Sequence, residues 1–196
     1  MSPRFAIILP ALMALSGCIP PTGPVEVTRF HAPDISALGK GSIAVEPAAG
    51  NDAASLEWRT YQAAVIRELV RLGYFEAPAG TAGQVAQLRL QRKVWRPERS
   101  GSPVSVGIGG SAGSYGSGLG IGIGLNLAGQ PKEQVETELG VLIKDRISQT
   151  ALWEGRASFT VRAGSPLADT ALGAPKVASA LFADFPGQPG ETVAVK

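Results

Sequence analysis

The segment from Gln134 to Arg162 restricts the fold most, because its side chains alternate with a period of two over nearly its whole length. Such alternation is typical of a β-strand with one buried face. The residues that share the apolar face are Val135, Thr137, Leu139, Val141 and Ile143, then Trp153, Gly155, Ala157, Phe159 and Val161. A polar stretch at residues 145–150 separates the two runs. The segment therefore predicts a long antiparallel hairpin with a turn near that stretch.

A long helix is predicted within residues 51–75. Its apolar residues recur at spacings of three and four, which places them in one stripe along a helix. They are Trp58, Tyr61, Val65, Leu69 and Leu72. Asn51, Asp52 and Ser55 are candidate N-caps, because their side chains can accept hydrogen bonds from the first N–H groups of the helix. Gly73 is placed where a glycine commonly follows the last turn.

A second helix is predicted after Ser165, which would cap it, with Pro166 at the first helical position. Pro175 is expected to kink or break this helix, because proline lacks the N–H that the helix needs. Its apolar residues are less regularly spaced than those of the first helix. The segment 186–196 is expected to form a loose tail.

Three shorter strands are predicted over residues 25–30, 41–47 and 84–95. Together the elements predict an α+β fold, in which a mixed, mainly antiparallel β-sheet carries one long helix and one broken C-terminal helix packed on it. We expect a single domain over residues 25–185, a length that can bury a core of its own. With one cysteine in the chain, the core rather than a disulfide must stabilise it.

The amino end is typical of an export signal. Arg4 precedes the apolar run Phe5–Leu15, which Pro10 interrupts, and the run is shorter than the roughly 20 residues of a transmembrane helix. The following Leu15-Ser16-Gly17-Cys18 resembles the lipobox of bacterial lipoproteins. That resemblance implies a signal peptide over residues 1–17, cleavage before Cys18, and acylation of the Cys18 thiol and amino group.

Residues 18–24 then form a lipidated tether, whose prolines favour a stiff, extended chain. The alternative is an ordinary signal peptide that is cut nearby and leaves Cys18 as a stray thiol. An unpaired thiol is a liability in an oxidising compartment, which favours the lipidated form. No aspartate follows Cys18, so by analogy with sorting in enteric bacteria we expect the outer membrane, on its periplasmic side, rather than the inner membrane.

A glycine-rich segment, 104–128, also alternates with a period of two. Leu119, Ile121, Ile123, Leu125 and Leu127 occupy every second position, as do Val104, Val106 and Ile108 upstream. The pattern predicts a β-hairpin with one aliphatic face and one bare face. Its bare residues Gly118, Gly120, Gly122 and Gly124 form a candidate contact face, because glycine lets another surface approach the backbone. The candidate occupants are Trp95 or Trp153, another sheet face, or an envelope protein or glycan partner.

Two enzyme motifs match this segment by chance. Residues 107–112 fit the dinucleotide-binding pattern G-x-G-x-x-A, but more glycine follows where a helix should begin. Ser111 fits the G-x-S-x-G nucleophile motif, but the only histidine, His31, lies upstream, whereas that motif expects its histidine downstream. Neither match supports a catalytic site.

The formal net charge is +2, which does not favour a nucleic-acid partner. A local basic run contains Arg89, Arg92, Lys93, Arg96 and Arg99. We interpret this run as a solvated strand face and turn; the alternative is a contact with anionic headgroups or lipopolysaccharide phosphates.

No catalytic residue, cofactor or metal site is expected, since one histidine and one acylated cysteine leave no ordinary zinc ligand cluster and no triad. The rival hypothesis is a carboxylate-dependent hydrolase that uses Glu136 and Glu138, about 7 Å apart on one strand face. A small-molecule or lipid carrier, with its ligand between helix and sheet, is the third. The leading hypothesis is a membrane-anchored envelope binding or structural module without catalytic activity.

With these elements in order, the chain resembles the bacterial lipoprotein family called Domain of Unknown Function 4136. The residues that carry the resemblance are Cys18 with its lipobox, the helix end Arg67–Tyr74, the glycine-rich segment, and Glu138–Phe159 with Leu-Trp-x-Gly-x-Ala. The resemblance implies an α/β domain at the envelope and no established activity. Lys144 and Arg146 flank Asp145 where such chains are more often hydrophobic, so no role is assigned to Asp145.

Overall fold

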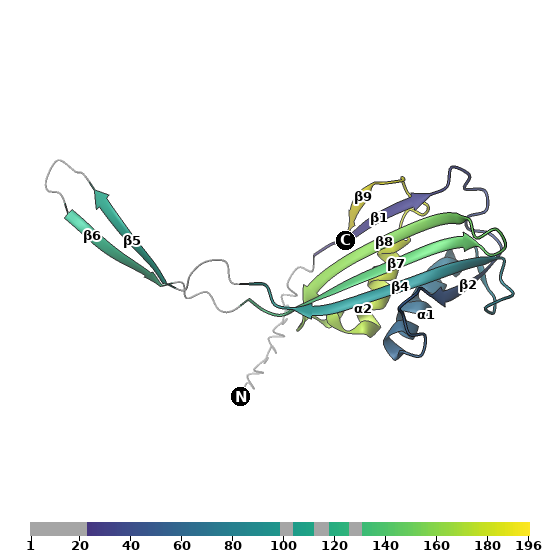
Figure 1. Cartoon of the computed structure of the whole chain (residues 1–196), viewed down its shortest axis with the longest axis horizontal. Coiled ribbons are helices and arrows are strands. Elements are labelled where there is room, and N and C mark those ends of the chain that lie inside the picture. Colours follow the sequence, from purple (N-terminus) through teal and green to yellow (C-terminus); the bar gives the residue numbers. More distant parts are fainter. Residues whose placement is uncertain (1–22, 99–103, 112–117, 126–130) are drawn as a thin grey trace, which may run out of the picture.

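The computed structural model describes residues 23–98, 104–111, 118–125 and 131–196. Seven strands form one mixed sheet, two helices pack on one face of it, and two more strands form a separate hairpin (Figure 1). The elements are β1 (Val25–His31), β2 (Ser42–Pro47), α1 (Leu56–Arg71), β3 (Phe75–Glu76), β4 (Gln84–Trp95), β5 (Val104–Ser111), β6 (Gly118–Leu125), β7 (Gln134–Asp145), β8 (Ala151–Arg162), the 3₁₀ turn η1 (Pro166–Ala168), α2 (Thr170–Leu181) and β9 (Thr192–Val195). The predicted α+β class is confirmed.

The strand order in the main sheet is β3-β2-β4-β7-β8-β1-β9. Among the described strands of this sheet, only β2 runs parallel to its neighbours β3 and β4, and every other pair is antiparallel. Because α1 lies between β2 and β4 in the chain, it provides the long crossover that a parallel pair needs. The hairpin predicted over residues 134–162 is β7 and β8, with Val135 opposite Val161 and a register shift at Ile143/Lys144.

One contiguous core lies between the sheet and the helices. The alternate residues of β7 and β8 named above, Val135 to Ile143 and Trp153 to Val161, are the buried ones, as predicted. Trp153 is 1% exposed. From α1 the buried residues are Trp58, Tyr61, Ala64, Val65 and Leu69. No helix of the described ranges covers the other face of the sheet, and polar side chains of β4, β7 and β8 line it.

The helix α1 begins and ends where local chemistry places its caps. Of the three candidate N-caps, Ser55 is the cap, and its hydroxyl accepts a hydrogen bond from the N–H of Trp58. The chain leaves the helix after Leu72 through Gly73, whose φ of 106° suits glycine. The observed helix is therefore shorter than the predicted range of 51–75.

The C-terminal helix is broken, but not at Pro175. Ser165 caps the short turn η1, with Pro166 at its first position, and Asp169 then caps α2 by accepting a hydrogen bond from the N–H of Ala171 at 2.7 Å. The break is at Asp169 because that side chain starts a new helix there. Pro175 lies inside α2, which continues to Leu181 although proline has no N–H to donate. The predicted break at Pro175 is therefore wrong, and the alternative of a kink there stays a prediction.

The segment 186–196 is not a loose tail. Its strand β9 pairs with β1, with Val193 opposite Val27 and Val195 opposite Val25, and both valines of β9 pack against the core. Gly187 and Gly190 have positive φ, which lets the chain reverse onto β1. Burial of two apolar side chains and a new row of backbone hydrogen bonds order this segment, so the domain extends beyond residue 185.

Candidate functional site

The segment that precedes β1 lies at one end of the main sheet. At this end, called the basal end, β4 finishes at Trp95, β7 begins at Gln134 and β8 finishes at Arg162. Gly23 lies here beside Thr160 of β8: a Cβ added to Gly23 would be 3.9 Å from the Thr160 carbonyl oxygen. A chain anchored before Gly23 is therefore held by its basal end.

A cavity of about 540 Å³ opens at the basal end, and Gly23 is part of its lining. Its charged lining residues are Arg96, Lys132, Arg162 and Glu133. Arg96 donates a hydrogen bond to Glu133 at 2.9 Å, which leaves Lys132 and Arg162 to give the lining its excess positive charge. A second cavity of about 270 Å³ shares Lys132 and Arg162. This cluster suits an anionic group, because phosphates and carboxylates accept hydrogen bonds from guanidinium and ammonium groups.

The basic run of β4 is divided between the two faces of the sheet. Arg92 points to the helix side, where it contacts Glu57 of α1 and donates hydrogen bonds to the Thr170 hydroxyl at 2.8 Å and the Ala168 carbonyl at 2.7 Å. Lys93 points the other way and pairs with Glu136 at 2.9 Å. Interpretation of the run as one solvated face is wrong for Arg92, because strand alternation puts it beside Leu88 and Leu90. Arg99 lies outside the described residues.

The predicted glycine-rich hairpin is present as β5 and β6, and residues 112–117 and 126–128 of its predicted range lie outside the described residues. Gly118, Gly120, Gly122 and Gly124 stand opposite Ser111, Gly109, Gly107 and Ser105. The candidate contact face is therefore glycine and serine on both strands. Trp153, one of the two tryptophans considered as occupants, is not on this face, because it stacks on Phe182 inside the core. Trp95 is the last residue of β4, and its contact with the glycine face stays a prediction.

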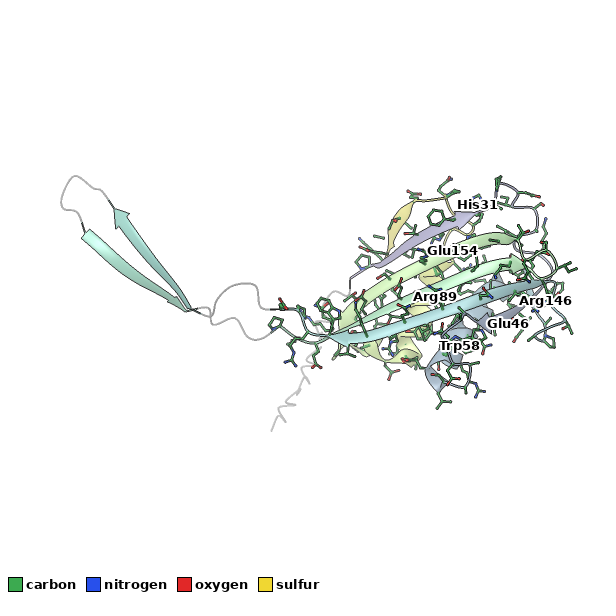
Figure 2. All side chains as sticks on the ribbon, viewed as in Figure 1. His31, Glu46, Trp58, Arg89, Arg146 and Glu154 are labelled. Atoms are coloured by element: carbon green, nitrogen blue, oxygen red, sulfur yellow. The ribbon has the colours of Figure 1, made fainter. Side chains whose placement is uncertain are left out.

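The open face of the sheet holds a shallow cleft that the sequence did not reveal. Gly140 of β7 lies between Arg89 of β4 and Arg156 of β8 in one row of the sheet. A cavity of about 250 Å³ forms above it, lined also by Glu138 and Glu154. Figure 2 labels Arg89 and Glu154, on the strands that flank β7. The sequence feature that could have indicated this cleft is Gly140, a glycine on the polar face of an alternating strand.

The two carboxylates of the rival hydrolase hypothesis lie on this open face. Glu136 pairs with Lys93, and Glu138 lines both the cleft and a cavity of about 190 Å³ beside it. The cleft also contains Arg156, which donates two hydrogen bonds to Glu154 at 3.0 and 2.6 Å. Its charges are thus balanced between acids and bases.

Asp145 stabilises the turn between β7 and β8. Its Oδ1 accepts hydrogen bonds from the N–H and hydroxyl of Ser148 and from the N–H of Ile147. The hydrogen bonds from Ser148 hold the pKa of Asp145 below its usual value, because they stabilise the charged carboxylate. Arg146 pairs with Glu46 at 2.6 Å at this end of the sheet, which is opposite the basal end (Figure 2).

Cys18 lies outside the described residues, so its lipidation stays a prediction. In the described ranges no group of three histidine, cysteine, aspartate or glutamate side chains is placed to hold a metal ion. The same part of the chain contains no helix of the length and apolar character needed to cross a membrane.

No known family model matches the chain, so the family resemblance of the sequence motifs also stays a prediction. The uncharacterized protein ZMO1243 of Zymomonas mobilis subsp. mobilis is 28% identical over 221 residues. That match covers 89% of this chain and 81% of the other protein.

Two solved structures resemble the chain at low sequence identity. A PDZ domain protein from Parabacteroides distasonis has a TM-score of 0.48 and 12% identity, and the match covers 88% of this chain. The chain spans 39% of the length of that protein. The PelC dodecamer from Paraburkholderia phytofirmans has a TM-score of 0.42 and 15% identity, over 80% of this chain and 96% of the PelC chain. Neither likeness assigns an activity to this chain.

Proposed function

We propose that this protein is a non-catalytic binding module of the bacterial envelope, anchored by lipid on Cys18 to the outer membrane on its periplasmic side. The observation that supports the proposal is that Gly23, five residues after Cys18, lines the basic cavity. The lipobox-like sequence before Cys18 supplies the anchor, and the basal end supplies a surface that suits anionic headgroups.

The length of the tether supports this orientation. Gly23 is the fifth residue after Cys18, and a fully extended chain advances at most about 3.3–3.6 Å per residue, so Gly23 lies within roughly 18 Å of the anchor. Each lysine or arginine close to an anionic membrane surface contributes about 1 kcal/mol of attraction, which fades within a Debye length of about 8 Å. A tether of this length allows Lys132 and Arg162 to come close enough to the membrane surface for this attraction to act.

The arrangement of the interior supports a binding or structural role over the carrier alternative. The space between helices and sheet, where a carried ligand would lie, is occupied by large buried side chains, among them Tyr61, Leu88, Leu139 and Phe159. The hydrolase alternative gains little support from an open face on which Glu136 is paired with Lys93. The partner that the module binds is an envelope protein, a glycan or the membrane itself.

Replacement of Cys18 tests the anchor. In cells labelled with radioactive palmitate, the wild-type protein should incorporate label and require detergent for extraction from membranes. The Cys18→Ser variant should incorporate none, because serine offers no thiol for acylation, and should fractionate as a soluble or uncleaved protein. Equal labelling and equal detergent dependence of the two proteins would contradict the proposal.

A further inference from the structure

We propose that the hairpin β5–β6 is a second membrane contact, whose aliphatic face lies at the boundary between headgroups and acyl chains of an anionic bilayer. The proposal rests on the proposed function only for the source of the membrane, since Cys18 would place the lipid beside the basal end. The affinity of the hairpin for a bilayer is a property of its own residues and can be measured without the anchor.

The pairing of β5 with β6 gathers the aliphatic residues on one face. Directly opposite residues of an antiparallel pair share a face. The aliphatic pairs are Val104 with Leu125, Val106 with Ile123, and Ile108 with Ile121. The intervening pairs consist of glycine and serine. In addition, no charged residue occurs from Ser100 to Pro131, so burial of this face in lipid removes no charge from water.

The hairpin is attached where the membrane should be. In the chain, β5 follows the end of β4 and β6 precedes the start of β7, so both connections lead to the basal end. Val94 and Trp95, the last residues of β4, are 65% and 40% exposed. Exposed tryptophan is typical of membrane interfaces, where its ring lies at headgroup level.

The charges at the attachment point suit an anionic bilayer. Lys132 lies just before β7, Arg162 ends β8, and both line the basal cavities. A stretch of uncharged, aliphatic chain next to basic residues combines apolar burial with attraction to anionic lipids, the two contributions that hold peripheral segments at a membrane surface. These observations favour a lipid bilayer as the occupant of the aliphatic face.

The depth of the contact follows from the strand edges. Among the described strands, β5 and β6 pair only with each other, so each has an outer edge of backbone N–H and C=O groups without a strand partner. Such groups cost several kcal/mol each in the hydrocarbon core. At the headgroup boundary water can reach them. The hairpin therefore lies along the interface, over roughly 26 Å for eight residues at about 3.3 Å rise each.

Tryptophan fluorescence provides a direct test, because Trp58 and Trp153 are 3% and 1% exposed and leave Trp95 as the accessible reporter. The protein is the mature chain 18–196 with Cys18→Ser, which retains every core residue but has no acyl group. It is mixed with vesicles of phosphatidylethanolamine and phosphatidylglycerol, with or without brominated acyl chains. We expect binding by flotation and quenching of Trp95 by the brominated lipid.

Paired variants assign the effect to one face. Ile121→Ser with Ile123→Ser should weaken vesicle binding at least tenfold, whereas Gly120→Ser with Gly122→Ser on the other face should change it less than twofold. An unchanged thermal melt must accompany both pairs. Lys132→Gln with Arg162→Gln should weaken binding to anionic vesicles and leave binding to neutral phosphatidylcholine vesicles unchanged.

Absence of Trp95 quenching by brominated lipid, or equal vesicle binding by the two hairpin variants, would overturn the proposal. So would a variant Ile121→Ser with Ile123→Ser that loses self-association but still binds vesicles, because the aliphatic face would then be an interface between copies. Failure of the vesicle experiment would not change the palmitate labelling of Cys18, so the proposed anchor would stand. Conversely, an unlabelled wild-type protein whose unacylated chain still binds vesicles would refute the anchor and retain the hairpin contact.

Discussion

Replacement of Gly155 by alanine should destabilise the protein, although alanine is the better strand residue. A Cβ at position 155 would lie 2.2 Å from Cη2 of Trp153 and 2.8 Å from Cδ1 of Leu181, whereas carbon atoms in contact are about 3.5–4.0 Å apart. The indole must therefore move. The indole stacks on the Phe182 ring, with 5.3 Å between the ring centroids, and its Nε1 donates a hydrogen bond to the Pro186 carbonyl at 2.9 Å.

The expected cost follows from these contacts. Overpacking of a core typically costs about 1–3 kcal/mol, and loss of the indole hydrogen bond adds about 1 kcal/mol. Reduced freedom of the unfolded chain returns about 0.4–1 kcal/mol for glycine to alanine. The net loss is about 2 kcal/mol, and for a chain of this size it lowers the melting temperature by roughly 4–8 °C. Thermal unfolding followed by circular dichroism measures it.

Gly140 provides the matched control, because it occupies the middle of the neighbouring strand β7. There a new Cβ would meet only the Arg89 Cβ, at an ordinary 3.6 Å, so Gly140→Ala should be neutral or slightly stabilising. The double variant Trp153→Ala with Gly155→Ala should cost no more than Trp153→Ala alone, since the colliding indole is absent. Equal, mild effects of Gly155→Ala and Gly140→Ala would refute the reasoning.

Three other changes test the core, the carboxyl end of α2 and the hairpin. Trp153→Ala should cost about 3–5 kcal/mol, the usual range for a buried aromatic side chain, and an unchanged melting temperature would refute its burial. Arg29, 4% exposed, donates hydrogen bonds to the Leu181 and Ala180 carbonyls at 2.9 Å each. Arg29→Met should lower the free energy of unfolding in urea by about 1–3 kcal/mol, because these buried acceptors are left unpaired. An unchanged urea midpoint would contradict this expectation. Gly122→Val should leave the thermal melt of the main domain unchanged, because among the described strands β6 pairs only with β5. A clear drop in the melting temperature would show that the glycine face packs on the domain.

The strongly periodic segments could be predicted from the sequence. The alternation of residues 134–162 and 84–95, the spacing of the apolar residues in α1, and the period-two pattern of the glycine-rich segment each gave the right element. These signals are local, because side chains repeat every 2 residues in a strand and every 3.6 in a helix. They also gave the α+β class.

Other features depend on residues that are distant in the sequence. The four-residue strand β9 has too short an alternation to stand out, and it is ordered only because β1 pairs with it. Arg92 looked like a solvated cation until α1 and η1 placed Glu57 and the Ala168 carbonyl around it. The cleft over Gly140 exists only through the alignment of three strands.

The sequence by itself determined which segments are strands and helices, which face of each is apolar, and that residues 100–131 carry no charge. The tertiary structure decided which of those faces meet. It brought Gly23, Lys132 and Arg162 to one end of the sheet and laid the indole of Trp153 over Gly155. The physical reason is that periodicity is a property of neighbouring residues, whereas strand order and side-chain packing depend on contacts between segments that the sequence keeps far apart.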